Sequence, residues 1–513
     1  MQVTGTETDS RPMRMASDMK QLSLRGVFIA AALVLSACGS ARGIDVAAKN
    51  MNVAGTGSIE IVGNGSWGWV GQMYRNPGPW LQIPVSDYTM TIDYAAGASR
   101  VQMTRAEPTQ DDVNQTLAFG QEYFDFLKKY LDEYLSGTSA WNVMTHDPVV
   151  VRPDRVAERI AAVQSTPHGF IKLAMANKAP FRETRHGGET NFTVGNQKFE
   201  GRFNAQGDLD LVRTWIDNNP VLGDMLVETH FQDYRTYDGV RFPSRITRFA
   251  GGHPILDLTI TDVRANVPAA ITVPEAVKNY QAPPLRVVGE LLAPGVWFML
   301  GGGYNSLLIE QVDHLIVVEP ASEEAEAQAV IAKAREMVPG KPIRFIVNTH
   351  THFDHSGGLR AYVAEGATVV TSAVNEEYYR KAWSNPRTIK PDAMAKTNAV
   401  PKFQPVEDKY TLSDGKRSVD VYAMRGVHHA ESMLMIHLPA EKVISVGDVY
   451  MPYPDNVPLT HTQVQGAAQL VENIERVGAD VAIVATIHGN RVGSMEELLV
   501  HAGRVAPKSA KAK

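Results

Sequence analysis

The side chains best suited to chemistry lie in one seven-residue stretch, residues 349–355 (THTHFDH), which a glycine pair follows at 357–358. It offers three imidazoles and one carboxylate, from His350, His352, Asp354 and His355. Zinc accepts histidine nitrogen and carboxylate oxygen together, whereas Ca²⁺ and Mg²⁺ prefer ligand sets made of oxygen. We therefore expect this stretch to bind a divalent metal ion, with zinc as the first choice.

An apolar run at 343–347 (IRFIV) must position these side chains. It is short and rich in β-branched residues, which predicts a buried strand. Because side chains alternate along a strand, an extended backbone would point His350 and His352 to the same side. Asp354 and His355 would then lie where the chain leaves the strand.

The chain begins with a segment typical of export. Arg25 precedes an apolar run at 27–35 (VFIAAALVL), and small residues then lead to Cys38. This pattern predicts a secretory signal over residues 1–38, too short to remain as a transmembrane helix. The residues LSAC at 35–38 resemble the bacterial lipobox, in which the cysteine is acylated and becomes the first mature residue.

We therefore expect export to the periplasmic side of a bacterial membrane, with anchoring through acylated Cys38. No later run has comparable length and apolarity, so the mature chain should not span the membrane. The alternative is a plain cleaved signal peptide in which the cysteine has no role. Because Cys38 is the only cysteine, an intrachain disulfide is excluded.

The length of 513 residues favours two or three domains rather than one core. Four prolines between 266 and 285 break helix and strand patterns and mark a boundary. We expect a small, polar linker at 39–55, a first domain at 56–281, a second at 286–506 and a basic tail at 507–513. The net charge of -6 gives no reason to expect a nucleic-acid partner.

The first domain should be mainly antiparallel β-structure with some helix. Apolar and polar residues alternate at 88–94, 99–104, 191–213 and 225–263, which predicts strands. Aromatic residues at helical spacing predict a helix over 111–135. The hairpins around 231–243 weakly resemble the half-barrel of periplasmic lipoprotein carriers. The histidines of this domain lack the spacing of metal ligands: His146, His168, His186, His230 and His253.

The second domain alternates strand and helix patterns, which predicts a layered α/β structure with helices on its outer faces. Its motifs occur in the order HTHFDH at 350–355 with the glycine pair, VHHAE at 427–431, GD at 447–448 and IHG at 487–489. From about residue 286 onward the chain resembles the metallo-β-lactamase-fold hydrolases. That resemblance implies an αββα sandwich with a dinuclear zinc site on one edge, between two sheets.

The resemblance also implies a ligand set. His350, His352 and His429 would hold the first zinc, Asp354, His355 and His488 the second, and Asp448 would bridge the two ions. The choice of His429 over His428 rests on its spacing from Pro439. Asp354 and Asp448 would anchor the ions and orient the attacking water. His437, His461 and His501 are interpreted as ordinary structural residues.

This ligand set implies hydrolysis by a metal-bridging hydroxide. The subclass of zinc β-lactamases with a cysteine ligand is excluded, since the only cysteine is Cys38. A bridging carboxylate at Asp448 favours a small ester, thioester or lactone as the substrate. The alternatives are a zinc β-lactamase-like enzyme, an iron enzyme with the same ligands, and a lipoprotein ligand carrier with a non-catalytic metal domain.

Overall fold

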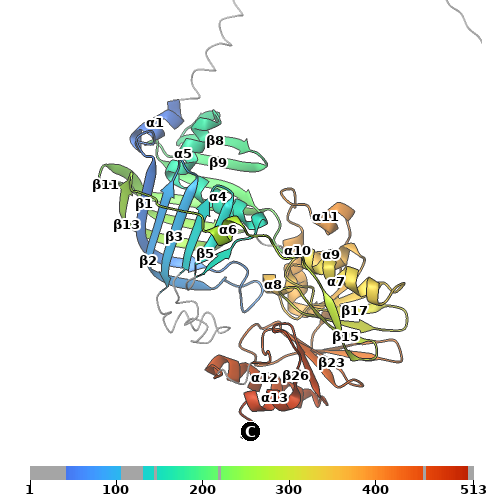
Figure 1. Ribbon diagram of the computed structural model, residues 1–513. Coiled ribbons are helices and arrows are strands. Elements are labelled where there is room, and N and C mark those ends of the chain that lie inside the picture. Colours follow the sequence, from blue (N-terminus) through green and yellow to red (C-terminus); the bar gives the residue numbers. More distant parts are fainter. Residues whose placement is uncertain (1–41, 106–130, 144–146, 218–220, 454–457, 507–513) are drawn as a thin grey trace, which may run out of the picture.

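The computed structural model describes residues 42–105, 131–143, 147–217, 221–453 and 458–506. An N-terminal antiparallel sheet and a C-terminal α/β region form its two parts (Figure 1). The signal over 1–38, the basic tail at 507–513 and the helix expected over 111–130 lie outside the described residues. The rest of that helix prediction is wrong, because residues 131–135 belong to a strand that pairs with its neighbour at 98–103.

The N-terminal part is built on one 13-stranded sheet, with the order β6-β5-β4-β3-β2-β1-β13-β12-β11-β10-β9-β8-β7. Neighbouring strands are antiparallel, so the expected architecture is confirmed. The strands are β1 (Ser58–Gly68), β2 (Gln82–Asp93), β3 (Ala98–Arg105), β4 (Leu131–Ser136), β5 (Ser139–Val143), β6 (Pro148–Val150), β7 (Phe181–Thr184), β8 (Gly187–Val194), β9 (Gln197–Phe203), β10 (Leu209–Ile216), β11 (Met225–Tyr237), β12 (Val240–Ala250) and β13 (His253–Ala265).

A turn at Asp238-Gly239 joins β11 to β12 directly. Both residues have positive φ, at 42° and 81°, as a two-residue hairpin of this kind requires.

Three helices cover one face of this sheet: α1 (Arg42–Asn50), α4 (Pro153–Gln164) and α5 (Pro167–Ala176). Their apolar side chains share a core with alternate residues of the strands. The polar linker expected at 39–55 is therefore corrected for its described part, since Ile44 and Ala47 of α1 are buried in that core. A short helix, α6 (Glu275–Lys278), follows β13 within the proline-rich boundary.

The C-terminal part contains two sheets that face each other. The first has the order β14-β15-β16-β17-β18-β19-β20, and the second has the order β21-β22-β23-β24-β25-β26. The first contains β14 (Val288–Ala293), β15 (Val296–Leu300), β16 (Ser306–Glu310), β17 (Leu315–Val318), β18 (Ile343–Val347), β19 (Thr368–Ser372) and β20 (Lys402–Val406). The second contains β21 (Lys409–Ser413), β22 (Ser418–Ala423), β23 (Leu434–Leu438), β24 (Val443–Val446), β25 (Ile483–Thr486) and β26 (Gly493–Ser494).

Apolar side chains from both sheets meet in one buried cluster, with Phe298 and Ile316 on one side and Val421 and Ile436 on the other. The outer face of the first sheet is covered by α7 (Glu324–Met337), α9 (Leu359–Ala364), α10 (Glu376–Trp383) and α11 (Ala393–Thr397). The outer face of the second is covered by α12 (His461–Val477) and α13 (Met495–His501). The layers are thus α, β, β and α, as expected.

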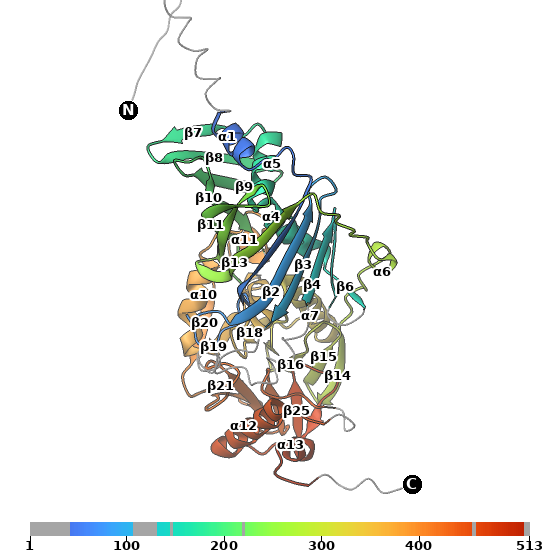
Figure 2. The ribbon, with the colours of Figure 1, turned by 90° about the vertical axis from the view of Figure 1, so that its left-hand side faces the viewer.

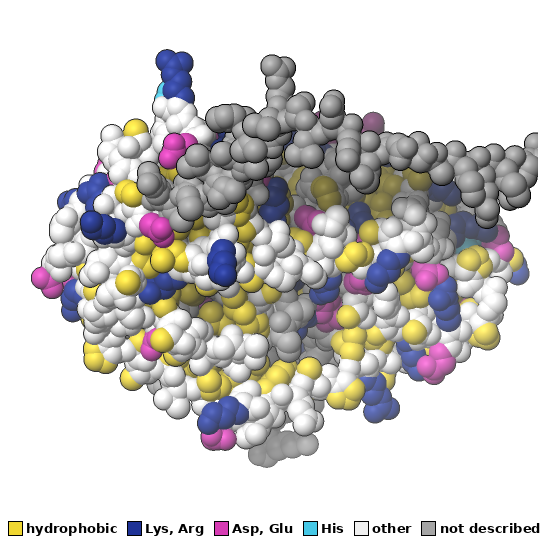
Figure 3. Space-filling model, turned by 90° about the horizontal axis from the view of Figure 1, so that it is seen from above, with side chains coloured by type: hydrophobic (Ala, Val, Ile, Leu, Met, Phe, Trp, Pro, Cys, Tyr) yellow, Lys and Arg dark blue, Asp and Glu magenta, His cyan; other side chains and the backbone are white. Residues whose placement is uncertain are grey.

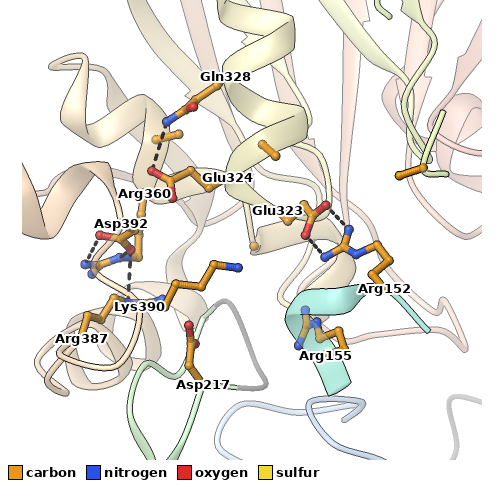
Figure 4. Close-up of a pocket in the computed structure, with 14 residues that line it drawn as sticks. Arg152, Arg155, Asp217, Glu323, Glu324, Gln328, Arg360, Arg387, Lys390 and Asp392 are labelled. Atoms are coloured by element: carbon orange, nitrogen blue, oxygen red, sulfur yellow. Dashed lines mark hydrogen bonds and ion pairs between the residues drawn. The ribbon is translucent and has the colours of Figure 1, made fainter. Parts of the chain in front are cut away.

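The two parts are in contact, with the N-terminal sheet above the α/β region in Figure 2. Arg152, beside α4, forms a bidentate ion pair with Glu323, beside α7. Both line a cavity of about 400 Å³ between the parts, where basic and acidic side chains lie side by side (Figure 4). Asp224 adds a second connection, because its carboxylate accepts hydrogen bonds from the backbone of Thr388 and Ile389.

Basic and acidic side chains are interspersed among apolar ones on the face seen from above (Figure 3). Among the described residues, no helix combines the length and the apolar composition that crossing a membrane requires.

Candidate metal centre

The histidine-rich stretch leaves the first sheet earlier than its pattern suggests. Strand β18 ends at Val347, so His350 and His352 lie in the following loop rather than on a strand. Their rings are nevertheless neighbours, with centroids 4.6 Å apart. Asp354 and His355 belong to a one-turn helix, α8 (Phe353–Ser356). The expectation that extended backbone aligns the first two imidazoles is therefore corrected.

Asn348 holds this loop in place. Its side-chain amide donates to the carbonyl oxygens of His350 and His355, at 2.6 and 2.8 Å. Its side-chain oxygen accepts hydrogen bonds from the hydroxyls of Thr371 and Tyr379. Because Asn348 is completely buried, these bonds fix both ends of the loop without competition from water.

Two groups of side chains bring potential ligand atoms to within 4.8 Å of one another. The first group contains His350, His352, His429 and Asp448, and the second contains Asp354, His355, Asp448 and His488. Together they contain all seven expected site residues. They come from loops that follow β18, β22, β24 and β25, at one edge of the two facing sheets.

Hydrogen bonds within the protein set the orientation of the imidazoles in the first group. The Thr349 hydroxyl donates to a carboxylate, so its oxygen accepts the proton of His350 Nδ1, 3.1 Å away. The lone pair of His350 Nε2 is then free, and this atom is buried without a hydrogen-bond partner among the described residues. His352 donates from Nε2 to the carbonyl oxygen of Met73 at 3.0 Å, which leaves its Nδ1 as the electron donor.

Hydrogen bonds within the protein also orient an imidazole of the second group. His355 donates from Nδ1 to Glu319 Oε1 at 2.9 Å, so its Nε2 lone pair faces the other ligands. That Nε2 lies 3.3 Å from Nε2 of His488. Imidazoles that point unprotonated nitrogens at each other repel unless a cation lies between them. The donor set therefore fits a metal ion.

Asp448 lies between the two groups. Its Oδ1 is 2.8 Å from His355 Nε2 and 2.9 Å from His488 Nε2, whereas its Oδ2 is 3.3 Å from His429 Nε2. Oδ1 has no partner in hydrogen-bond geometry within the described part of the chain. One carboxylate therefore presents one oxygen to each group, which is the arrangement of a bridging ligand.

The charges at this centre also call for a cation. Burial would raise the pKa of Asp448, but the neighbouring His355, His488 and His429 lower it well below its usual range. Burial would lower the pKa of His355, but in the metal-free protein Asp448, Asp354 and Glu319 raise it well above its usual range, so a bound ion would displace a proton from its Nε2. The buried Asp448 carboxylate therefore keeps its negative charge, and divalent ions are a natural counter-charge for such a group.

Asp354 is positioned by two side chains that its sequence neighbourhood does not contain. Tyr304 donates its hydroxyl to Oδ2 at 2.9 Å, and Gln72 donates its amide to Oδ1 at 3.2 Å. The Tyr304 ring also packs edge-on against His355 and His488. Gln72 and Met73 belong to the segment 69–81 that joins β1 to β2, so the N-terminal sheet contributes directly to the centre.

Other histidines have separate roles. His428 bonds through Nδ1 to Gln469 on α12, which turns it away from its neighbour His429. His437 bonds to the carbonyl of Asp480, and His501 bonds to Tyr450. His168 is buried in the N-terminal core. Within the described residues, no histidine of the N-terminal part belongs to a potential metal-binding group.

The fold and the paired His/Asp groups define a metal-dependent hydrolase. Residues 299–483 match the model of the metallo-beta-lactamase superfamily. The family match lies wholly within the α/β region, so the N-terminal sheet is outside it.

The solved structures that are similar to part of this chain include the following three. The metallo-beta-lactamase FIM-1 from Pseudomonas aeruginosa, in its mono-zinc form, has 17% identity over 43% of this chain and 94% of its own, with a TM-score of 0.33. A metallo beta lactamase from Hirschia baltica has 21% identity over 44% and 99%, with a TM-score of 0.32. One from Erythrobacter litoralis has 19% identity over 42% and 95%, with a TM-score of 0.31.

Proposed function

We propose that the protein is a dinuclear zinc hydrolase that acts on a small ester, thioester or lactone. The observation that carries this proposal is the position of Asp448, which presents one carboxylate oxygen to each of the two His/Asp groups. His350, His352 and His429 would hold the first ion, Asp354, His355 and His488 the second, and Asp448 both. The same ligands can hold iron, so the metal must be measured.

When bound, such ions would supply a water of near-neutral pKa and polarise a substrate carbonyl. Hydrogen bonds from other side chains and the backbone hold the ligand side chains in the orientation that this reaction needs. Glu319 and Thr349 orient His355 and His350, and the Met73 carbonyl orients His352. The Tyr304 hydroxyl and the Gln72 amide hold both oxygens of Asp354, so this carboxylate cannot rotate away from the second group.

The bridging carboxylate, Asp448, would distinguish between substrates. It places negative charge beside the second group, where His355 and His488 approach its Oδ1. Opening a β-lactam ring leaves an anionic nitrogen that this position would have to stabilise, and the added charge reduces that stabilisation. An ester or thioester leaves an oxygen or sulfur of lower pKa, which demands less of the site.

Metal analysis and a side-by-side substrate comparison test this proposal. We expect about two zinc ions per chain, and kcat/KM for a lactone and a thioester above that for a carbapenem and a cephalosporin. Higher values for the β-lactams would replace the proposal by the β-lactamase alternative. Tightly bound metal with no turnover of any of the four substrates would favour the carrier alternative.

We also propose that acylated Cys38 anchors the enzyme on the periplasmic side of a bacterial membrane. The support is the apolar run and lipobox-like end of residues 1–38. The first described element, helix α1, begins at Arg42, close in sequence to Cys38. The enzyme would then act within a short distance of the membrane surface.

A further inference from the structure

A cavity of about 500 Å³ lies on the inner face of the N-terminal sheet, between its strands and α4. Its wall contains large apolar side chains, among them Trp67, Tyr88, Met90 and Met103, from three adjacent strands. Aromatic rings give such a wall rigid apolar area, and methionine side chains adapt to the shape of a guest. The cavity therefore suits an apolar chain.

This cavity adjoins the metal centre through two segments. Trp69 and Val70 line it, and Gln72 and Met73 of the same segment contact Asp354 and His352. Phe353 also lines it, and this residue stands between those two candidate ligands in the chain. Consecutive Cα atoms are about 3.8 Å apart, so the cavity begins within one residue of the metal centre.

One cation in the cavity wall is incompletely partnered. Arg248, on β12, donates from Nε to Thr229 Oγ1 at 3.2 Å. Its terminal guanidinium nitrogens have no hydrogen bond or ion pair within the described part of the chain. Two other arginines line the wall. Arg155 has an interaction of its own, and Arg159 is occupied by Glu133, Asn142 and two backbone carbonyls.

Glu158, on α4, is a carboxylate whose charge acts on Arg248. Burial and the charge of Glu133 raise the pKa of Glu158 to about 7. Its negative charge is therefore incomplete at neutral pH, and it balances Arg248 only in part. A half-buried guanidinium with two open donor groups complements an anion.

We propose that this cavity binds the non-reacting part of the substrate, and that this part is an apolar acyl chain with an anionic group at its far end. The inference rests on the proposed hydrolase function, whose metal centre would cleave the ester or thioester bond at the near end of the chain. The apolar wall would bind the chain, and Arg248 would bind the terminal anion.

The kinetic experiment uses p-nitrophenyl half-esters of dicarboxylic acids of increasing chain length, from glutarate to sebacate. The matched uncharged substrates are p-nitrophenyl esters of monocarboxylic acids of the same length. We expect the full-length zinc enzyme to prefer the charged member of the best pair by about tenfold in kcat/KM, the size of one charge-assisted hydrogen bond. Arg248→Ala should bring that ratio close to one.

Arg245→Ala is the matched control, because Arg245 lies on the same strand but pairs with Asp257 on the exposed face. It should keep the wild-type ratio. Val101→Trp fills the cavity from β3 and should lower kcat/KM for the long chains relative to p-nitrophenyl acetate. Gln102→Trp, on the other face of the same strand, should not do so. Circular dichroism verifies that each variant is folded.

A direct binding experiment separates the cavity from the chemistry. The probe is dansyl-undecanoate, whose fluorescence rises in an apolar site, titrated into wild type, Asp448→Ala, Arg248→Ala and Arg245→Ala. We expect binding to all four, at least about tenfold weaker in Arg248→Ala.

Ester hydrolysis without any preference for chain or charge, together with no probe binding, would overturn the cavity inference and leave the hydrolase intact. Arg248-dependent probe binding without zinc-dependent hydrolysis of any ester would overturn the proposed function instead.

Discussion

Glu319 Oε1 accepts a hydrogen bond from His355 Nδ1 at 2.9 Å, and both side chains are completely buried. The second oxygen of Glu319 accepts from Thr349, which in turn orients His350. One carboxylate thus aligns imidazoles in both His/Asp groups. Glu319 has a φ of +72°, a strained conformation for a residue other than glycine, and such strain typically marks a functional position.

Glu319→Gln should therefore weaken metal binding at both groups. The amide is a weaker acceptor for His355, and its NH₂ group cannot replace the oxygen that accepts from Thr349. Loss of such a supporting carboxylate lowers metal affinity about 10- to 100-fold. Competition with a chelator measures the affinity, and Glu365→Gln, which removes a surface ion pair with Arg335, is the control. Unchanged affinity in Glu319→Gln would refute this role.

Asp448→Ala should weaken the second ion more than the first and reduce turnover severely. Its Oδ1 lies within 2.9 Å of two histidines in the second group, whereas Oδ2 is 3.3 Å from the single histidine approached in the first. Metal content after dialysis and kcat on an activated ester measure the two effects. A variant that keeps two tightly bound zinc ions and full activity would contradict the assignment of Asp448 as the bridge.

Gln72→Leu should lower kcat/KM about 2- to 10-fold, the range for a single hydrogen bond. The substitution removes the amide that donates to Asp354 Oδ1, while Tyr304 still holds Oδ2. Gln82→Leu is the control, since that amide donates to the backbone carbonyls of Trp80 and Pro254 in the N-terminal part. Equal activity of the two variants would show that the contact between the parts does not affect catalysis.

The sequence predicted the grouping of His and Asp side chains best where they are close together in the chain. His350, His352, Asp354 and His355 fall within six residues, so their types and spacing alone indicated the chemistry. The expectation for His429, Asp448 and His488 came from the resemblance to the metallo-β-lactamase-fold hydrolases. Gln72 was missed because its partner, Asp354, is 282 residues away, and no local pattern reports such a contact. Glu319 was missed because it follows the apolar strand β17 and has no motif of its own.

Two misread segments have local causes. Residues 131–135 (LDEYL) have helix-compatible composition, but pairing with β3 makes them a strand, since tertiary context overrides weak propensity. The segment read as a polar linker contains Ile44, Ala47 and Met51 at helical spacing. The alanines and glycines around them lowered its apparent apolarity, so the buried face of α1 was overlooked.

The N-terminal core should lose stability in acid through His168. This buried side chain donates from Nε2 to the carbonyl of Met51, and burial lowers its pKa from 6.5 to about 4. The unfolded chain binds a proton near pH 6.5 whereas the folded one does not, so stability is lost as pH falls from about 6.5 to about 4. Between pH 7 and about pH 4.5 the loss is about 2 kcal/mol.

Urea unfolding of wild type and His168→Gln at the two pH values measures this term. The free-energy difference between the two proteins should shrink by that amount in acid. His186→Gln, at an exposed position of the same part, should show no such change. A constant difference between wild type and His168→Gln would exclude His168 as the source.

Cys38→Ser should release the protein from the membrane fraction or leave its signal uncleaved. Two or more acyl chains anchor a protein stably, whereas a single chain binds only marginally. Fractionation of cells expressing each form, together with metabolic labelling by a fatty acid, measures the effect. Identical soluble behaviour of wild type and variant would establish the plain signal peptide.

The Met73 carbonyl that receives the proton of His352 has a thermodynamic consequence for the whole molecule. If docking of the N-terminal sheet strengthens metal binding, metal binding must strengthen that docking by the same factor, because such coupling is reciprocal. A tenfold effect corresponds to about 1.4 kcal/mol in either direction. The bound ion would then stabilise the contact between the N-terminal sheet and the α/β region. Scarcity of zinc would weaken that contact as well as stop hydrolysis.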